Sequence, residues 1–234
     1  MNMLDRHTIR LWTHEFQDVT ATPPSWLALL DEKELMHCKQ FRQEKDRIAY
    51  AAAHALLRTA LSRALEIPPV SLTIDHDRMG KPFINTPGCM NMAITLSHTS
   101  GMVAVALSQA GNIGVDVEAI DRKNIPHHDF SAYGLSHEEI AMLASLSHHE
   151  RCEAFIDFWT AREAVAKADG RGLSLPFSDI RIDLSVNEAT IHEKGPSPSS
   201  HWTLWREQPS SRYRLALAWP QGKGAFTRMN EQLI

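Results

Sequence analysis

The spacing of apolar residues along the chain predicts two long helices. Between residues 49 and 64, alanines and leucines recur at alternating intervals of three and one, which places them along one stripe of a helix. The helical pattern runs from about residue 31 to residue 65, and Pro68 stops it soon afterwards. A second apolar stripe predicts a helix over residues 155–169 that ends at Gly170.

Short apolar runs and apolar–polar alternation predict strands before, between and after these helices. The first strand covers residues 8–16, where apolar and polar side chains alternate. A short helix capped by Ser25 is predicted to run through Leu30, and another begins near His137, behind a capping box of Ser136 and Glu139. The remaining predicted strands are 71–74, 94–97, 102–107, 113–120, 179–184, 201–206 and 212–219.

The order of these elements is repeated once along the chain. A helix, then PPVSLTID, a hairpin and MVAVALS resembles a helix, then LPFSDIRID, a hairpin and YRLALAW. We therefore predict an α+β fold of two similar α+β halves packed together, with the boundary between 1–110 and 111–234. Ligands often bind where two such halves meet. Residues 121–137 are predicted as a loop and residues 195–199 as a turn.

Composition narrows the class of protein. The chain has 234 residues, of which 43% are hydrophobic and 22% charged, as in soluble globular proteins. Its formal charge of −4 gives no overall basic field, which disfavours nucleic-acid binding. Cys38, Cys89 and Cys152 are scattered and odd in number, which favours a reducing compartment. Without an apolar stretch of membrane length or a signal-peptide core, we expect no membrane association and a cytoplasmic location.

The first candidate for chemistry is the stretch Gly-Val-Asp-Val-Glu at residues 114–118. In a strand, Asp116 and Glu118 point to one side while Val115 and Val117 point to the core. Two adjacent carboxylates repel each other unless a positive group lies near them. They are either a solvated strand edge or a site for a hard cation such as Mg²⁺.

The second long helix carries a further carboxylate and a lysine. Glu163 and Lys167 lie four residues apart on one face, opposite the apolar stripe. The simplest interpretation is a surface ion pair that stabilises the helix by a few tenths of a kcal/mol. Alternatively, Lys167 could bind a phosphate, because an ammonium group is a compact positive charge. The local sequence leaves both interpretations open.

Two short polar elements could contact an anion. Gly-Lys-Pro places Lys81 in a tight turn, and the strand at 94–97 ends in Ser97 and His98. An ordinary turn lysine and a capped loop histidine are the simpler interpretations. The chain contains no Gly-x-x-x-x-Gly-Lys-Ser/Thr or Gly-x-Gly-x-x-Gly loop, so nucleotide binding of those types is unsupported.

Taken in order, these motifs resemble those of the Sfp-type 4′-phosphopantetheinyl transferases. The motifs are Gly-Lys-Pro, Ser-His-Thr, Gly-Val-Asp-Val-Glu and Trp-Thr-Ala-Arg-Glu-Ala-Val-Ala-Lys-Ala-x-Gly-x-Gly-Leu, and the resemblance runs from about Leu29 to Pro220. It implies a monomer whose two halves form an internal dimer with pseudo-twofold symmetry. Such an enzyme moves the phosphopantetheine arm of coenzyme A onto a serine of an apo-acyl or peptidyl carrier protein. The reaction would depend on Mg²⁺, or on Mn²⁺ in its place, and would release adenosine 3′,5′-bisphosphate.

The resemblance also assigns roles to individual residues. The metal ligands of the family fall on Asp116, Glu118 and Glu163. Glu163 also matches the residue proposed to take the serine proton, and Lys167 matches the lysine that neutralises the pyrophosphate. The coenzyme A contacts fall on Lys45, on the 76–81 segment including Arg78 and Lys81, and on Ser97 and His98.

Two positions depart from the family pattern. Thr95 stands where relatives often have asparagine, and His54 stands where many have an arginine in the first long helix. Because Arg58 remains available on the same helix, we expect altered nucleotide contacts and retained activity. Two other functions compete with the transferase: a carrier-protein-binding module that has lost the reaction, and a Mg²⁺-dependent hydrolase of the coenzyme A pyrophosphate.

Overall fold

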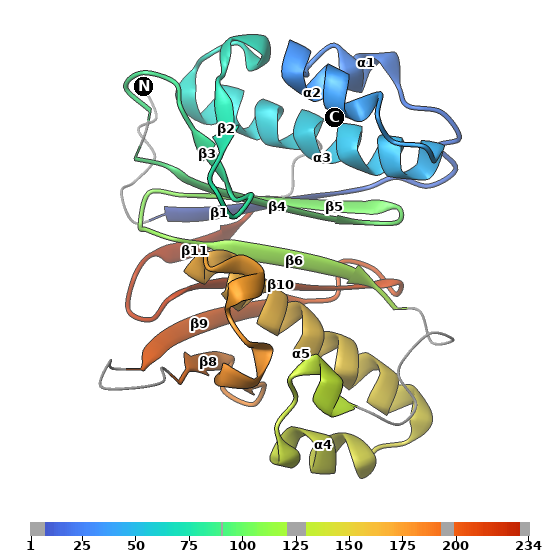
Figure 1. The fold of residues 1–234 in the computed structure, drawn as a ribbon, viewed down its shortest axis with the longest axis vertical. Coiled ribbons are helices and arrows are strands. Elements are labelled where there is room, and N and C mark those ends of the chain that lie inside the picture. Colours follow the sequence, from blue (N-terminus) through green and yellow to red (C-terminus); the bar gives the residue numbers. More distant parts are fainter. Residues whose placement is uncertain (1–7, 90, 121–129, 193–198, 230–234) are drawn as a thin grey trace. The chain divides into compact units, whose positions relative to one another are not determined.

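In the computed structural model, which describes residues 8–89, 91–120, 130–192 and 199–229, each of two compact units combines a sheet with one long helix (Figure 1). The first unit comprises the chain up to Asn112 together with the segment from Lys223, and the second comprises Ile113–Gly222. The long helix has 22 residues in both units. The prediction of an α+β fold with two similar halves is therefore confirmed.

The first unit has a four-stranded sheet and a separate hairpin. The strand order in the sheet is β11-β1-β5-β4, and β5 runs antiparallel to both of its neighbours. The elements are β1 (Thr8–Glu15), α1 (Pro24–Leu27), α2 (Glu32–Cys38), α3 (Glu44–Leu65), η1 (Pro69–Ser71), β2 (Ile74–His76), β3 (Pro82–Ile84), β4 (Ala93–Thr99), β5 (Met102–Ser108) and β11 (Ala225–Arg228).

The core of the first unit forms where α3 packs on this sheet. The alanine and leucine stripe of α3, which includes Ala52, Leu56 and Ala60, is buried together with Ile94 and Val105 of the sheet. Small side chains on the helix allow its backbone to lie close to the strands, so α3 contacts both β4 and β5.

Three predictions for the first unit were wrong. The short helix α1 begins at Pro24, behind Pro23, and ends at Leu27, so Ser25 does not cap it and it stops before Leu30. The helix predicted over residues 31–65 is divided into α2 and α3 by residues 39–43, where the Phe41 ring packs against His37 and Tyr50. The strand predicted at 71–74 begins only at Ile74, because a 3₁₀ turn precedes it. The strands β3 and β11 were not predicted.

The second unit has a five-stranded antiparallel sheet in the order β6-β10-β9-β8-β7. Its long helix packs on β6 and β10. The elements are β6 (Gly114–Ala119), η2 (Phe130–Tyr133), α4 (His137–Ala144), α5 (His148–Asp169), η3 (Gly172–Ser174), η4 (Phe177–Asp179), β7 (Ile180–Asp183), β8 (Glu188–Ile191), β9 (Ser200–Glu207) and β10 (Tyr213–Pro220).

Helix caps explain where α4 and α5 begin and end. The predicted capping box of Ser136 and Glu139 is present at the start of α4. An equivalent box of Ser147 and Glu150 starts α5 seven residues before the predicted position. Gly170 ends α5 in the left-handed region, with φ of 91°, as predicted. The strand β8 was not predicted, and the parts of the predicted loop and turn at 121–129 and 195–198 lie outside the described residues.

The last strand of the chain belongs to the first unit. The chain passes from the first unit to the second between Asn112 and Ile113. Residues 223–234 were assigned to the second half, but β11 pairs in parallel with β1, from Thr8 opposite Ala225 to Leu11 opposite Arg228. Among the described residues, no helix combines the length and the apolar character that crossing a bilayer requires.

Candidate active site

A glycine at the start of β6 lets the helix α5 lie directly against that strand. A Cβ atom built on Gly114 would come within 2.0 Å of the carbonyl oxygen of Ala164 and 2.4 Å of the amide nitrogen of Ala168. It would also lie 2.9 Å from the Cβ atom of Lys167. The close approach brings Glu163 and Lys167 to the strand of Asp116 and Glu118. This role of Gly114 was missed, although a glycine inside a strand pattern often indicates close backbone approach.

The centre of the site is an ion pair between the helix and the strand. The Nζ atom of Lys167 donates to Oδ1 of Asp116 at 2.7 Å. Asp116 is only 3% exposed, so a solvated strand edge is the wrong interpretation for this residue. The Lys167 side chain keeps about a third of its surface exposed, 33%. Lys167 therefore connects two elements, beyond any role within its own helix.

The two glutamates of the site hold their protons more tightly than exposed glutamates do. Burial, and next the charge of Asp116, raise the pKa of Glu118 to about 7, although Lys167 and a hydrogen bond with Trp159 oppose the shift. Burial also raises the pKa of Glu163, with Lys167 opposing and Asp116 adding to the shift. Three carboxyl groups and one lysine thus interact electrostatically at the site, and the site favours additional positive charge.

The donor set has the chemistry of a hard-cation site. Carboxylate oxygens are the ligands that Mg²⁺ prefers. The acidic groups of the site outnumber Lys167, and a divalent cation would neutralise this excess of negative charge. Among the residues that the structure describes, no three histidine, cysteine, aspartate or glutamate side chains are grouped closely enough to hold a metal ion. The assignment of Asp116, Glu118 and Glu163 as metal ligands accordingly stays a prediction.

An aromatic wall borders the site on α5. Trp159 lies one turn before Glu163, and its ring contacts Tyr133 and Phe177 edge-on at centroid distances of 5.7 Å and 5.4 Å. Tyr133 also contacts Phe155 on the same helix at 5.3 Å. These rings fix the position of Trp159, whose hydrogen bond reaches Glu118. The sequence indicated Trp159 only as part of its motif.

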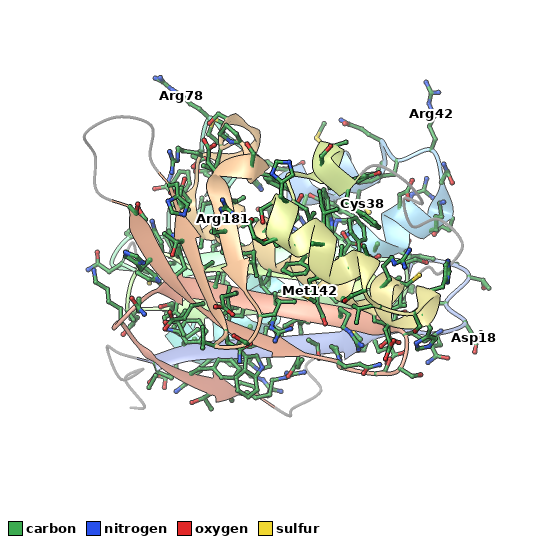
Figure 2. All side chains as sticks on the ribbon, turned by 90° about the horizontal axis from the view of Figure 1, so that it is seen from below. Asp18, Cys38, Arg42, Arg78, Met142 and Arg181 are labelled. Atoms are coloured by element: carbon green, nitrogen blue, oxygen red, sulfur yellow. The ribbon has the colours of Figure 1, made fainter. Side chains whose placement is uncertain are left out.

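The residues predicted to contact coenzyme A all lie in the first unit, and three of them are basic. Lys45 is exposed in the first turn of α3. Arg78 and Lys81 belong to the turn between β2 and β3, where Oδ1 of Asp77 accepts the backbone N–H of Lys81 at 2.9 Å and Gly80 has φ of 85°. Figure 2 shows the side chain of Arg78 extending away from the ribbon. The predicted tight turn is present.

The other two predicted contacts, Ser97 and His98, lie on opposite faces of one strand. Ser97 is buried beside Thr95, whereas His98 is exposed on the face of β4 that also carries Ile94. Thr95, the first departure from the family pattern, thus shares its face with Ser97 and not with His98. The strand does not bring the side chains of Ser97 and His98 together.

The first unit also contains a cavity of about 430 Å³ that the sequence did not predict. His37, Tyr50, His54 and His76 line it, and His76 belongs to the predicted 76–81 segment. The Nδ1 atom of His54 lies 2.8 Å from Oε1 of Glu34, and its ring stacks on Tyr50 at a centroid distance of 4.1 Å. The second departure from the family pattern therefore lies in a ligand-sized cavity. Arg58, which was expected to remain available, is instead 0% exposed and paired with Glu34.

Comparisons with known proteins agree over nearly the whole described chain. Residues 112–218 match the model of the 4′-phosphopantetheinyl transferase superfamily, and residues 16–110 match that of the N-terminal part of a 4′-phosphopantetheinyl transferase. A Synechocystis sp. protein provisionally named as such a transferase is 26% identical, over 84% of this chain and 81% of that protein. The transferase HetI of Nostoc sp. is 24% identical (90% and 86%), and a 4′-phosphopantetheinyl transferase of Bacillus subtilis is 26% identical (68% and 68%).

Proposed function

Because this chain is an enzyme of the 4′-phosphopantetheinyl transferase superfamily, we propose that it transfers the phosphopantetheine group of coenzyme A to a serine of an apo-carrier protein. The other product would be adenosine 3′,5′-bisphosphate. One observation carries the proposal most directly. The contact between β6 and α5 brings Lys167 to Asp116 and places both beside Glu118 and Glu163, within the region that matches the superfamily model.

The reaction exchanges the phosphoanhydride bond of coenzyme A for a phosphate ester bond to the serine. The serine Oγ atom forms a bond to the phosphorus that carries the pantetheine arm, and the bond from that phosphorus to the bridging oxygen of the pyrophosphate breaks. The electron pair leaves with adenosine 3′,5′-bisphosphate. Glu163 would accept the serine proton, and its raised pKa suits this role, because a carboxylate with a raised pKa is a stronger base than an exposed one.

Lys167 would stabilise the negative charge that develops on the leaving group. Its ammonium group is paired with Asp116 at 2.7 Å, yet a third of the side chain stays exposed. A pyrophosphate oxygen could therefore be bound from the exposed side of the ammonium group. A charge of this kind, held in place by a buried partner, needs little reorganisation during the reaction.

Asp116, Glu118 and Glu163 would hold Mg²⁺, and Mn²⁺ could replace it. When bound, the cation would neutralise charge on the pyrophosphate. Burial of Asp116 supports this assignment, because a buried carboxylate is already desolvated and oriented by its partner Lys167.

The first unit would supply the contacts with the nucleotide of coenzyme A. Lys81 and Arg78 in the turn between β2 and β3, and Lys45 in α3, offer positive charge for phosphates. Ser97 and His98 would contribute from different faces of β4. Neutral replacement of Lys81 or His98 should raise the KM for coenzyme A more than the KM for the carrier. Comparison with dephospho-coenzyme A then identifies any residue that binds the 3′-phosphate.

One experiment separates this function from its two rivals. The protein is incubated with coenzyme A, Mg²⁺ and an apo-carrier protein, with a carrier whose serine is replaced by alanine as control. The proposed function predicts that the intact carrier alone gains the mass of the phosphopantetheine group. Loss of coenzyme A without this gain would indicate a hydrolase, and binding without any reaction would indicate a carrier-binding module.

A further inference from the structure

A buried ion pair on α5 joins three elements of the second unit. Arg162 is 0% exposed, and its Nη2 atom donates to Oε2 of Glu139 in α4. Glu139 is the third helical residue of the α4 capping box, where its Oε2 atom also accepts the backbone N–H of Ser136 at 2.7 Å. Its other oxygen accepts the backbone N–H of Ile182 in β7 at 3.3 Å. Glu139 thus fixes α5 relative to α4 and β7.

The same pair occurs at the same place in the first unit. Arg58 is the fifteenth residue of the 22-residue helix α3, as Arg162 is of α5, and it is also 0% exposed. Its partner Glu34 is again the third helical residue of a capping box, at the start of the short helix α2. We call each pair the helix clamp of its unit, namely Glu34 with Arg58 in the first unit and Glu139 with Arg162 in the second. Because the pair occurs in both units, it belongs to the architecture of each unit.

The arginines of the two pairs differ in how many of their guanidinium nitrogen atoms make hydrogen bonds. In the first unit the cap residue is Asp31, whose carboxylate also accepts a hydrogen bond from Arg58, and two backbone carbonyls, of Pro69 and Leu72, complete the set. In the second unit the cap is Ser136, and within the described ranges the Nε and Nη1 atoms of Arg162 are buried without a hydrogen-bond partner. Glu139 is therefore the sole carboxylate partner of Arg162 among the described residues.

We propose that the helix clamp of the second unit positions the active site of that unit. Arg162 directly precedes Glu163 on a rigid helix, so the ion pair with Glu139 sets the rotation of α5 and hence the direction of Glu163 and Lys167 toward β6. In α3 the residue that follows the equivalent arginine is Thr59, and the clamp there supports no such carboxylate. Glu139 and Arg162 are thus positioning residues. Their effect on turnover rests on the proposed function.

The first test replaces Glu139 by glutamine, which keeps the shape and an oxygen to accept the Ser136 N–H, but removes the charge and the acceptor for the Ile182 N–H. We expect kcat to fall about tenfold or more, with little change in the KM for coenzyme A, when both proteins are assayed well below their melting temperatures. The matched control is Glu150→Gln, because Glu150 occupies the same position in the exposed capping box of α5 and makes its bonds to Ser147. Its kcat should stay unchanged. A normal kcat in folded Glu139→Gln, or an equal fall in both variants, overturns the proposal.

The second test does not depend on activity. Chemical acetylation of Lys167, measured by mass spectrometry, should become faster in Glu139→Gln and stay unchanged in Glu150→Gln, because a rotated helix loses the ion pair with Asp116. If the wild-type protein transfers no phosphopantetheine, the proposed function fails, while the labelling still decides whether the clamp orients α5. Unchanged labelling in Glu139→Gln overturns the proposal.

A gain-of-stability variant covers the case in which Glu139→Gln does not fold. Ser136→Asp supplies the carboxylate that Asp31 supplies in the first unit, so it should bond Arg162 and raise the melting temperature. Ser147→Asp makes the same exchange at a cap whose neighbouring Arg151 already donates to the backbone carbonyls of Leu143, Ala144 and Leu146, so it should raise the melting temperature less. An equal effect of the two variants, or destabilisation by Ser136→Asp, would contradict the equivalence of the two clamps on which the proposal is built.

Discussion

Replacing Gly114 by alanine should disturb the site through a single added methyl group. The new Cβ atom would lie 2.0 Å from the carbonyl oxygen of Ala164 and 2.4 Å from the amide nitrogen of Ala168, whereas ordinary contact begins at 3.4 Å. Both obstacles are backbone atoms of α5, so no side-chain rotation relieves the overlap. The helix has to move away from β6 by about 1 Å or more.

The expected effects follow from that displacement. Overpacking of this kind costs about 1–3 kcal/mol of folding free energy, and the melting temperature of a chain of this size falls by about 2–4 °C per kcal/mol. The ion pair between Lys167 and Asp116, now 2.7 Å, would lengthen with the helix. A displacement of about 1 Å near reacting groups can reduce turnover by about 10²-fold. We therefore expect a large fall in kcat at temperatures where the variant is still folded.

Thermal unfolding and the carrier-labelling rate, measured on the same preparation, test this reasoning. The control is Gly222→Ala, in the same unit, where φ of 76° strains an alanine but no atom lies within 4 Å of the added group. This control should lose stability and keep its kcat. A Gly114→Ala protein with wild-type melting temperature and wild-type kcat would refute the close approach of α5 to β6.

Three further predictions concern the charged groups of the site. Excess EDTA should abolish transfer, and Mg²⁺ or Mn²⁺ should restore it. Asp116→Ala should remove most activity, and full activity of that variant without added metal would contradict the metal assignment. Glu163→Gln should lower kcat by roughly 10² or more, and Lys167→Met should lower it strongly while carrier binding persists; near-normal turnover would leave either residue with a structural role only. The pKa of Glu118 is raised from 4.5 to about 7, so between these pH values the folded protein binds a proton that the unfolded chain has lost. In EDTA, the free energy of unfolding should therefore decrease as the pH rises from about 4.5 to 7. Glu118→Gln should make this decrease shallower in melting curves recorded across that range.

Local signals predicted the elements that hold the site. The alternation around Asp116 and the apolar stripe of α5 identified the strand and the helix, because burial imposes these periodicities on the sequence. The start of α5 was placed seven residues late, although the same cap pattern that identified α4 was present at Ser147. The short strands β3 and β8 were missed, since three or four residues carry too little periodic signal.

Contacts between distant segments could not be predicted from local pattern. Nothing near Lys167 in the sequence shows that its ammonium group reaches Asp116, and nothing near Glu139 shows that it pairs with Arg162. The burial of Asp116 was also missed, because a carboxylate in a strand pattern usually indicates the solvent face. These features depend on the packing of α5 on the sheet, which a one-dimensional pattern does not specify.

The pairing of β11 with β1 has a consequence for the order in which the chain can fold during synthesis. The second unit is continuous, from Ile113 to Gly222, so all of it can emerge from the ribosome before β11 does. The first unit, although it is made first, waits for the last strand, and until then β1 is an open edge on which another strand could pair. Chains released before residues 225–228 should therefore fold their second unit and aggregate through their first. A ribosome-stalled series of lengths, probed by proteolysis, would show the second unit protected earlier than the first.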